Sequence, residues 1–135
     1  MVGLRILVVD DEQAIRSALQ RLLDSHEGWS VVGTARDGVE AISKAKDLRP
    51  DVVVMDISMP EMNGLSATPQ IKKAVPETEV LIFSQYAIRG LMREAEVAGA
   101  SGYLVKSRTS SIIPAIEALA DHKYFFDVDA LSDIS

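Results

Sequence analysis

Five short apolar runs recur along the chain, and each is followed by a segment in which apolar residues have helical spacing. The apolar runs cover residues Ile6–Val9, Val31–Ala35, Val52–Met55, Val80–Phe83 and Tyr103–Val105. The segments with helical spacing cover residues Ile15–Leu23, Val39–Ala45, Leu65–Val75, Ile88–Ala95 and Ile112–Leu119. This alternation predicts right-handed βαβ units, with a parallel sheet whose two faces are both covered by helices.

The expected fold is therefore a doubly wound α/β domain with a five-stranded parallel sheet and five helices. Nearly continuous apolar runs fit strands that are buried on both faces. The second run is interrupted by Gly33 and Thr34, so it suits the edge of the sheet better than its centre.

Two prolines fall inside the expected helices. Pro114 is compatible with a fifth helix that begins near Ser110 or Ser111, because N–H groups in a first turn lack intrahelical partners. Pro69 would remove an interior hydrogen bond from a third helix that began near Gly64. We therefore expect a kink in the third helix, or a later start.

Size and charge exclude several classes of protein. A chain of 135 residues fits one domain, and the absence of cysteine excludes disulfides and thiolate metal sites. The net charge of −6 argues against direct nucleic-acid binding, which depends on lysine and arginine at phosphates. No apolar run approaches the roughly 20 residues of a membrane span, and the amino terminus is a poor secretion signal. We expect a soluble, cytoplasmic domain.

Polar residues follow four of the five apolar runs directly. Asp10 and Asp11 follow the first run, Asp56 the third, Ser84 the fourth and Lys106 the fifth. Each could simply cap a helix or close a turn. However, ligands of open parallel sheets bind outside the carboxyl ends of the strands, where these side chains would meet. Their convergence favours a binding or reactive site.

The chemistry of these side chains favours phosphoryl transfer. Clustered carboxylates repel one another unless a cation joins them, and oxygen ligands alone suit a hard ion such as Mg²⁺. A carboxylate can also attack phosphorus to form an acyl phosphate. A metal ion, a lysine and a hydroxyl would neutralise the charge that develops in that reaction.

Four motifs resemble the receiver domains of two-component response regulators over roughly residues 4–121. They are LVVDDE, VVMDISMPEMNGL, LIFS and GYLVK, in that order and at the family's spacing. The GYLVK and HKYFFD stretches look most like the NarL/FixJ subfamily, whose receivers usually precede a LuxR-type helix-turn-helix. The resemblance implies a flavodoxin-like (CheY-like) fold with strand order 2-1-3-4-5. It assigns residues 1–121 to a receiver domain and 122–135 to a tail or the start of a linker to an absent output domain.

The resemblance also implies a metal site and a phospho-acceptor. Asp56 would accept the phosphoryl group and would also contact Mg²⁺. Asp11 would bind the ion directly, whereas Asp10 would bind it mainly through water. The backbone carbonyl of Ser58 would be the third protein ligand.

The remaining implied roles concern the phosphoryl group and the response to it. Lys106 would pair with the phosphoryl oxygens, and Ser84 would donate a hydrogen bond to them. Tyr103 would be the aromatic residue whose rotamer follows Ser84, turning inward after phosphorylation.

Three positions depart from the family pattern. Gln85 stands where Ala or Gly is usual, and its side chain could narrow access to Asp56 and slow phosphorylation. Tyr86 is bulky and could shield an acyl phosphate from water. Pro69 lies in the helix that follows the active-site loop. These departures put the rate in doubt rather than the role, and Ser58, Gln85 and Tyr86 are the residues expected to modulate the rate.

The resemblance implies a phospho-acceptor signalling domain rather than a turnover enzyme. A sensor histidine kinase would supply the phosphoryl group, and phosphorylation would change partner binding or drive homodimerisation. A covalently linked helix-turn-helix would convert this into transcription regulation. One alternative is a receiver-like interaction module that works without phosphate, and another is a stand-alone receiver. A haloacid dehalogenase-type hydrolase is disfavoured, because its acidic proton donor is replaced by Ser58.

Overall fold

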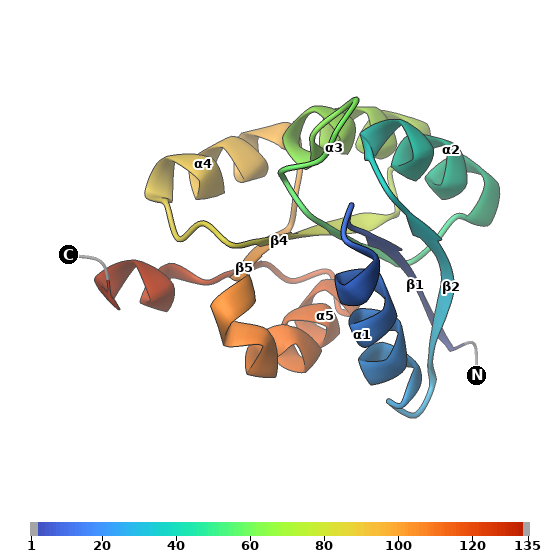
Figure 1. The fold of residues 1–135 in the computed structure, drawn as a ribbon, viewed down its shortest axis with the longest axis horizontal. Helices are drawn as coiled ribbons and strands as arrows, with labels where there is room; N and C mark the ends of the chain where they lie inside the picture. Colours follow the sequence, from blue (N-terminus) through green and yellow to red (C-terminus); the bar gives the residue numbers. More distant parts are fainter. Residues whose placement is uncertain (1–2, 134–135) are drawn as a thin grey trace.

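The computed structural model describes residues 3–133, which form one parallel sheet between two layers of helices (Figure 1). The strands are β1 (Leu4–Val9), β2 (Trp29–Ala35), β3 (Val52–Met55), β4 (Glu79–Ser84), β5 (Gly102–Val105) and β6 (Phe125–Phe126). The α-helices are α1 (Gln13–Asp24), α2 (Gly38–Leu48), α3 (Gly64–Ala74), α4 (Arg89–Ala98) and α5 (Ile112–Ala120). Two 3₁₀ helices, η1 (Lys106–Ser111) and η2 (Val128–Asp133), complete the described residues.

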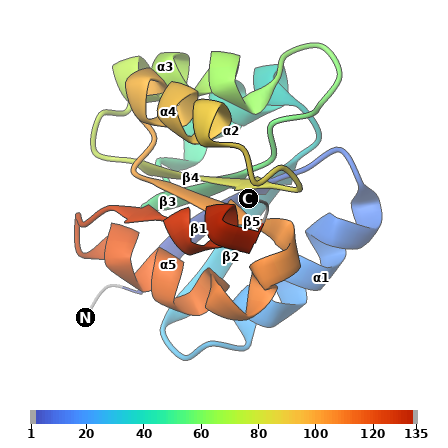
Figure 2. The ribbon, with the colours of Figure 1, turned by 90° about the vertical axis from the view of Figure 1, so that its left-hand side faces the viewer.

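Helices α2, α3 and α4 cover one face of the sheet, and α1 and α5 cover the other (Figures 1 and 2). Successive residues of a strand pack against opposite helical layers. Leu7, Val53 and Ile82 pack on the first side, whereas Ile6, Val54 and Leu81 pack on the second. All six are fully or almost fully buried, which explains why the runs in the sequence are continuously apolar. None of the helices in the described residues is long and apolar enough to cross a membrane.

The predicted fold class is confirmed, but the predicted number of strands is wrong. The sheet has six strands in the order β2-β1-β3-β4-β5-β6, and β2 lies at one edge as expected. The added strand, β6, pairs with the edge of β5 that a five-stranded sheet would leave open. The N–H of Phe125 donates to the carbonyl of Ser101, and that of Asp127 to the carbonyl of Tyr103, both at 2.9 Å. Unpaired edge groups of β5 are satisfied in this way.

Residues 122–135 were assigned to a tail or linker, and the described part of them continues the fold. Phe125–Phe126 belong to the sheet, and η2 follows directly. Ala130 is buried against the layer that contains α4. That a linker to an output domain begins in this segment stays a prediction.

The two prolines behave differently. Helix α5 begins at Ile112, so Pro114 lies in its first turn as predicted. Helix α3 begins at Gly64, with the side chain of Asn63 accepting the N–H of Ser66, so the expected later start is wrong. Pro69 is exposed inside this helix, and the expected kink stays a prediction.

Candidate functional site

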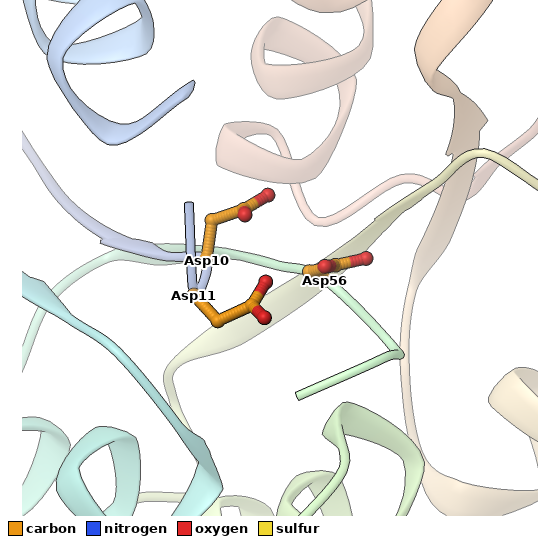
Figure 3. A group of neighbouring side chains, drawn as sticks. All are labelled: Asp10, Asp11 and Asp56. Carbon is orange, nitrogen blue, oxygen red and sulfur yellow. The ribbon is translucent and has the colours of Figure 1, made fainter. Parts of the chain in front are cut away.

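The carboxyl ends of β1, β3, β4 and β5 lie side by side and bring the predicted side chains to one edge of the sheet. Val9 pairs with Met55, Met55 with Ile82, and Ser84 with Val105, so the residues that follow these strands are neighbours. Figure 3 shows the side chains of Asp10 and Asp11 extending toward the side on which Asp56 lies. Their ligand oxygens lie within 4.8 Å of one another.

The surrounding backbone holds two of these carboxylates in place. The side chain of Asp10 accepts a hydrogen bond from the N–H of Glu12 at 2.9 Å. The side chain of Asp56 accepts one from the N–H of Ile57 at 2.8 Å. Asp10 and Asp56 are 1% and 6% exposed, whereas Asp11 is exposed to solvent. The cluster is therefore built on two buried carboxylates, with a third on the open side.

Lys106 supplies the positive charge of the cluster. Its Nζ lies 2.9 Å from Oδ2 of Asp10 and 3.5 Å from Oδ2 of Asp56. The same ammonium lies 5.8 Å from the centre of the Phe83 ring. The sequence separation of 96 residues between Lys106 and Asp10 shows that the fold alone brings this pair together.

The electrostatics of the cluster favour an additional cation. The pKa of Asp56 is raised to about 6, first by burial and then by the charge of Asp10, and Lys106 opposes both. Burial alone would lower the pKa of Lys106, but its hydrogen bond to Asp10 and the charges of Asp56 and Asp10 raise it. The Lys106 ammonium contacts two of the three carboxylates, Asp10 and Asp56, and the side-chain ligands of the cluster are all oxygens. This donor set fits a hard divalent ion.

Ser84 and Tyr103 hold the loop after β4 from two sides. The hydroxyl of Ser84 accepts the N–H of Tyr86 at 3.1 Å. The hydroxyl of Tyr103 donates to the carbonyl of Tyr86 at 2.6 Å. Tyr103 is fully buried, so the inward position that was expected after phosphorylation is already the one observed.

The residues predicted to modulate rate lie on the rim of the site. Ser58 is exposed in the loop between β3 and α3, and Gln85 is exposed directly after β4. Tyr86 is 39% exposed. Their positions are compatible with an effect on access to Asp56, which stays a prediction.

One contact of the site was missed by the sequence analysis. Arg16 in α1 donates from Nη1 to the carbonyl of Asp10 at 2.6 Å. This contact ties the first turn of α1 to the end of β1. The helical spacing of the segment after Asp11 placed Arg16 on the expected helix, but a bond to a backbone carbonyl leaves no pattern in a sequence.

Gly64 sets a steric limit on the site, and its replacement by alanine tests that limit. A Cβ at Gly64 would lie 2.1 Å from the carbonyl oxygen of Asp56, a backbone atom that has no room to yield. We expect Gly64→Ala to lower the free energy of unfolding by about 1–3 kcal/mol, the usual cost of overpacking. Gly90→Ala is the matched control, because a Cβ there meets nothing within 4 Å. Denaturant unfolding of both variants measures this difference, and equal stability would contradict the close contact.

Comparison with known proteins identifies the family. The family model described as "Response regulator receiver domain" matches residues 6–117. The chain belongs to this family. The receiver is 41% identical over 110 residues to the transcriptional regulatory protein LnrK of Bacillus subtilis, covering 82% of this chain and 50% of that protein. It is 37% identical over 120 residues to the chemotaxis protein CheY of Thermotoga maritima, covering 88% of this chain and 99% of that protein.

A solved structure supports the same assignment and the expected subfamily. The receiver resembles a LuxR-family two-component response regulator from Aurantimonas sp. SI85-9A1, with a TM-score of 0.91 and 33% identity. The match covers 98% of this chain and 95% of the other. The receiver spans only about half the length of LnrK. The predicted resemblance to response regulators of the LuxR type is confirmed.

Proposed function

We propose that this receiver accepts a phosphoryl group on Asp56, in a Mg²⁺-dependent reaction, from a sensor histidine kinase. The observation that carries the proposal is the position of Asp56. Its buried carboxylate lies at the end of a central strand, within 3.5 Å of the Lys106 ammonium and close to Asp10 and Asp11. A carboxylate so placed combines a nucleophile with the groups that neutralise charge on a phosphoryl oxygen.

The metal would be held by the side chains of Asp10, Asp11 and Asp56, with the backbone carbonyl of Ser58 as a further ligand. When bound, Mg²⁺ would supply positive charge to the phosphoryl oxygens and relieve repulsion among the carboxylates. The crowded carboxylates and the raised pKa of Asp56 support this assignment, because both are relieved by a cation.

In the transfer itself, a carboxylate oxygen of Asp56 forms a bond to phosphorus as the bond between phosphorus and the kinase histidine breaks. The electron pair of the broken bond stays on the histidine nitrogen. The carboxylate attacks in its ionised form, which has no proton to lose, so no base is needed. Lys106 would pair with the phosphoryl oxygens. The hydroxyl of Ser84 accepts the N–H of Tyr86 and also interacts with the hydroxyl of Tyr103, and it would turn its own proton toward the phosphoryl group.

Phosphorylation adds charge and acceptor oxygens at the end of β3, and Ser84 and the loop after it would respond. We propose that this changes partner binding or dimerisation, as a signalling event rather than enzymatic turnover, and that it takes place in the cytoplasm. In a longer protein it would control a LuxR-type DNA-binding domain, as the likeness to LnrK and to the LuxR-family regulator suggests. Direct nucleic-acid binding by this chain, whose net charge is −6, is not part of the proposal.

Incorporation of phosphate from a small acyl-phosphate donor tests this function. The wild-type chain is expected to be labelled with Mg²⁺ and unlabelled with EDTA, whereas Asp56→Asn removes the nucleophile and abolishes labelling. Asp47→Asn is the control, because Asp47 is an exposed aspartate of α2. Intact-mass spectrometry under non-hydrolysing conditions measures the adduct. Labelling of Asp56→Asn at the wild-type level would refute the assignment, and an unlabelled wild-type chain would favour a module that works without phosphate.

A further inference from the structure

Asp127 is a buried carboxylate outside the site described above. It lies in the segment between β6 and η2, beyond the domain boundary expected from the sequence, and is only 6% exposed. A charge is not buried without partners that compensate for its lost hydration. The partners of Asp127 show what its carboxylate does.

Both partners of this carboxylate flank Lys106 in the chain. Oδ1 lies 3.1 Å from Nε of Arg108, two residues after Lys106. Oδ2 accepts the N–H of Val105, the residue before Lys106, at 3.5 Å. The carboxylate therefore contacts the chain on each side of the lysine that pairs with Asp10 and Asp56.

The backbone around Lys106 needs such support. Lys106 begins η1, and Arg108 departs from helical geometry, with φ −113° and ψ 41°. The carbonyl of Lys106 accepts the hydroxyl of Thr109 at 2.6 Å, which is a local bond within the same turn. Apart from the contacts of the Lys106 side chain itself, the contacts described above that tie this turn to a separate part of the chain are those of Asp127.

We propose that Asp127 is a positioning residue for Lys106, so that the segment after α5 completes the phosphorylation site. This inference rests on the proposed phosphorylation of Asp56. Asp127 touches none of the reacting groups and acts through Lys106, whose ammonium must stay near the carboxylate oxygens as the phosphoryl group arrives. The backbone N–H of Asp127 also bonds to Tyr103, so the segment is anchored to β5 independently of its carboxylate.

The test is a double-mutant cycle on the rate of labelling by the acyl-phosphate donor at saturating Mg²⁺. Asp127→Asn removes the charge at nearly constant volume, and with it the ion pair with Arg108, so we expect it to slow labelling about tenfold. In a Lys106→Ala background, the same change should not slow labelling further, because the side chain through which Asp127 acts is already absent. Asp121→Asn is the control, since Asp121 is an exposed aspartate of the same region.

Affinity for Mg²⁺ separates positioning from a general structural role. The proposed metal ligands directly follow β1 and β3, and no hydrogen bond or ion pair described above joins them to Asp127, so Asp127→Asn should not weaken Mg²⁺ binding. A merely structural role would weaken Mg²⁺ binding and slow labelling equally in both backgrounds. Arg108→Gln breaks the pair from the other side and carries the same cycle if Asp127→Asn fails to fold.

Three results would overturn the inference. They are a wild-type rate in a folded Asp127→Asn variant, an equal slowing with and without Lys106, and a loss of Mg²⁺ affinity that matches the loss of rate. A wild-type chain that takes no label at all would refute the proposed function itself, and the two failures are thereby distinguished.

Discussion

Replacing Lys106 by alanine is expected to lower the free energy of unfolding of the metal-free chain by about 3 kcal/mol in mildly alkaline buffer, the cost of removing one partner of a buried ion pair. The side chain of Lys106 is 17% exposed and lies 2.9 Å from Asp10 and 3.5 Å from Asp56. Without it, two buried carboxylates face each other without the ammonium that contacts both of them. The loss is larger than that of a surface pair because water screens neither charge well.

The stabilisation that Lys106 provides is expected to change with pH in a defined direction. The pKa of Lys106 is raised above 10.5 in the folded chain, so its contribution is present below that pH and is lost as pH rises through the folded value. On the acid side, the contribution decreases as Asp56 is protonated below about pH 6. Urea unfolding in EDTA across this range measures the difference. Lys123→Ala is the control, because Lys123 forms only an exposed pair with Asp121, and equal stability of Lys106→Ala and wild type would contradict the prediction.

Replacing Asp56 by asparagine is expected to have the opposite effect on stability. The pKa of Asp56 is raised from 3.8 to about 6, because folding buries the carboxylate beside Asp10. Above that pH the folded chain carries an ionised group that it would hold more easily when neutral, at a cost of about 2–3 kcal/mol. Asparagine is neutral at every pH and keeps an oxygen that can accept the N–H of Ile57. We therefore expect Asp56→Asn to be more stable than wild type by about this amount near pH 8.

The pH window distinguishes this gain from a general effect of substitution. Between about pH 6 and 3.8 the folded chain binds a proton at Asp56 before the unfolded chain does, so the advantage of asparagine decreases through this range and vanishes below it. Thermal unfolding in EDTA at a series of pH values measures this decrease, with Asp47→Asn as the control. Added Mg²⁺ should stabilise wild type more than Asp56→Asn. A constant difference at all pH values would contradict the assigned cause.

The convergence of Asp10, Asp56, Ser84 and Lys106 could be predicted because it follows from topology. Each residue comes directly after a buried parallel strand, and the carboxyl ends of such strands share one edge. The sixth strand could not be predicted in the same way. It has two residues and no periodic pattern, and it forms because an open edge of β5 is available. The start of α3 was missed for a related reason, since capping by Asn63 outweighed the penalty of an exposed Pro69.

Contacts between side chains and backbone atoms also could not be predicted from the sequence. Arg16, Tyr103 and Asp127 each bond to a peptide group of another element, and any side chain in the right place could do so. The chemistry of the candidate site could be predicted from its residue types. The residues that hold the site in place could be identified only from the fold.

The two hydrogen bonds that meet at Tyr86 have a consequence for how the loop after β4 moves. Its N–H is held by Ser84 and its carbonyl by Tyr103, so neither partner can shift without straining the other bond. Rearrangement of this loop should therefore be cooperative, with both bonds kept or both lost. Backbone amide resonances near Tyr86 would then exchange between two discrete chemical shifts, and intermediate positions would not be populated. If the loop takes part in the proposed response to phosphorylation, we expect that response to be two-state and not graded.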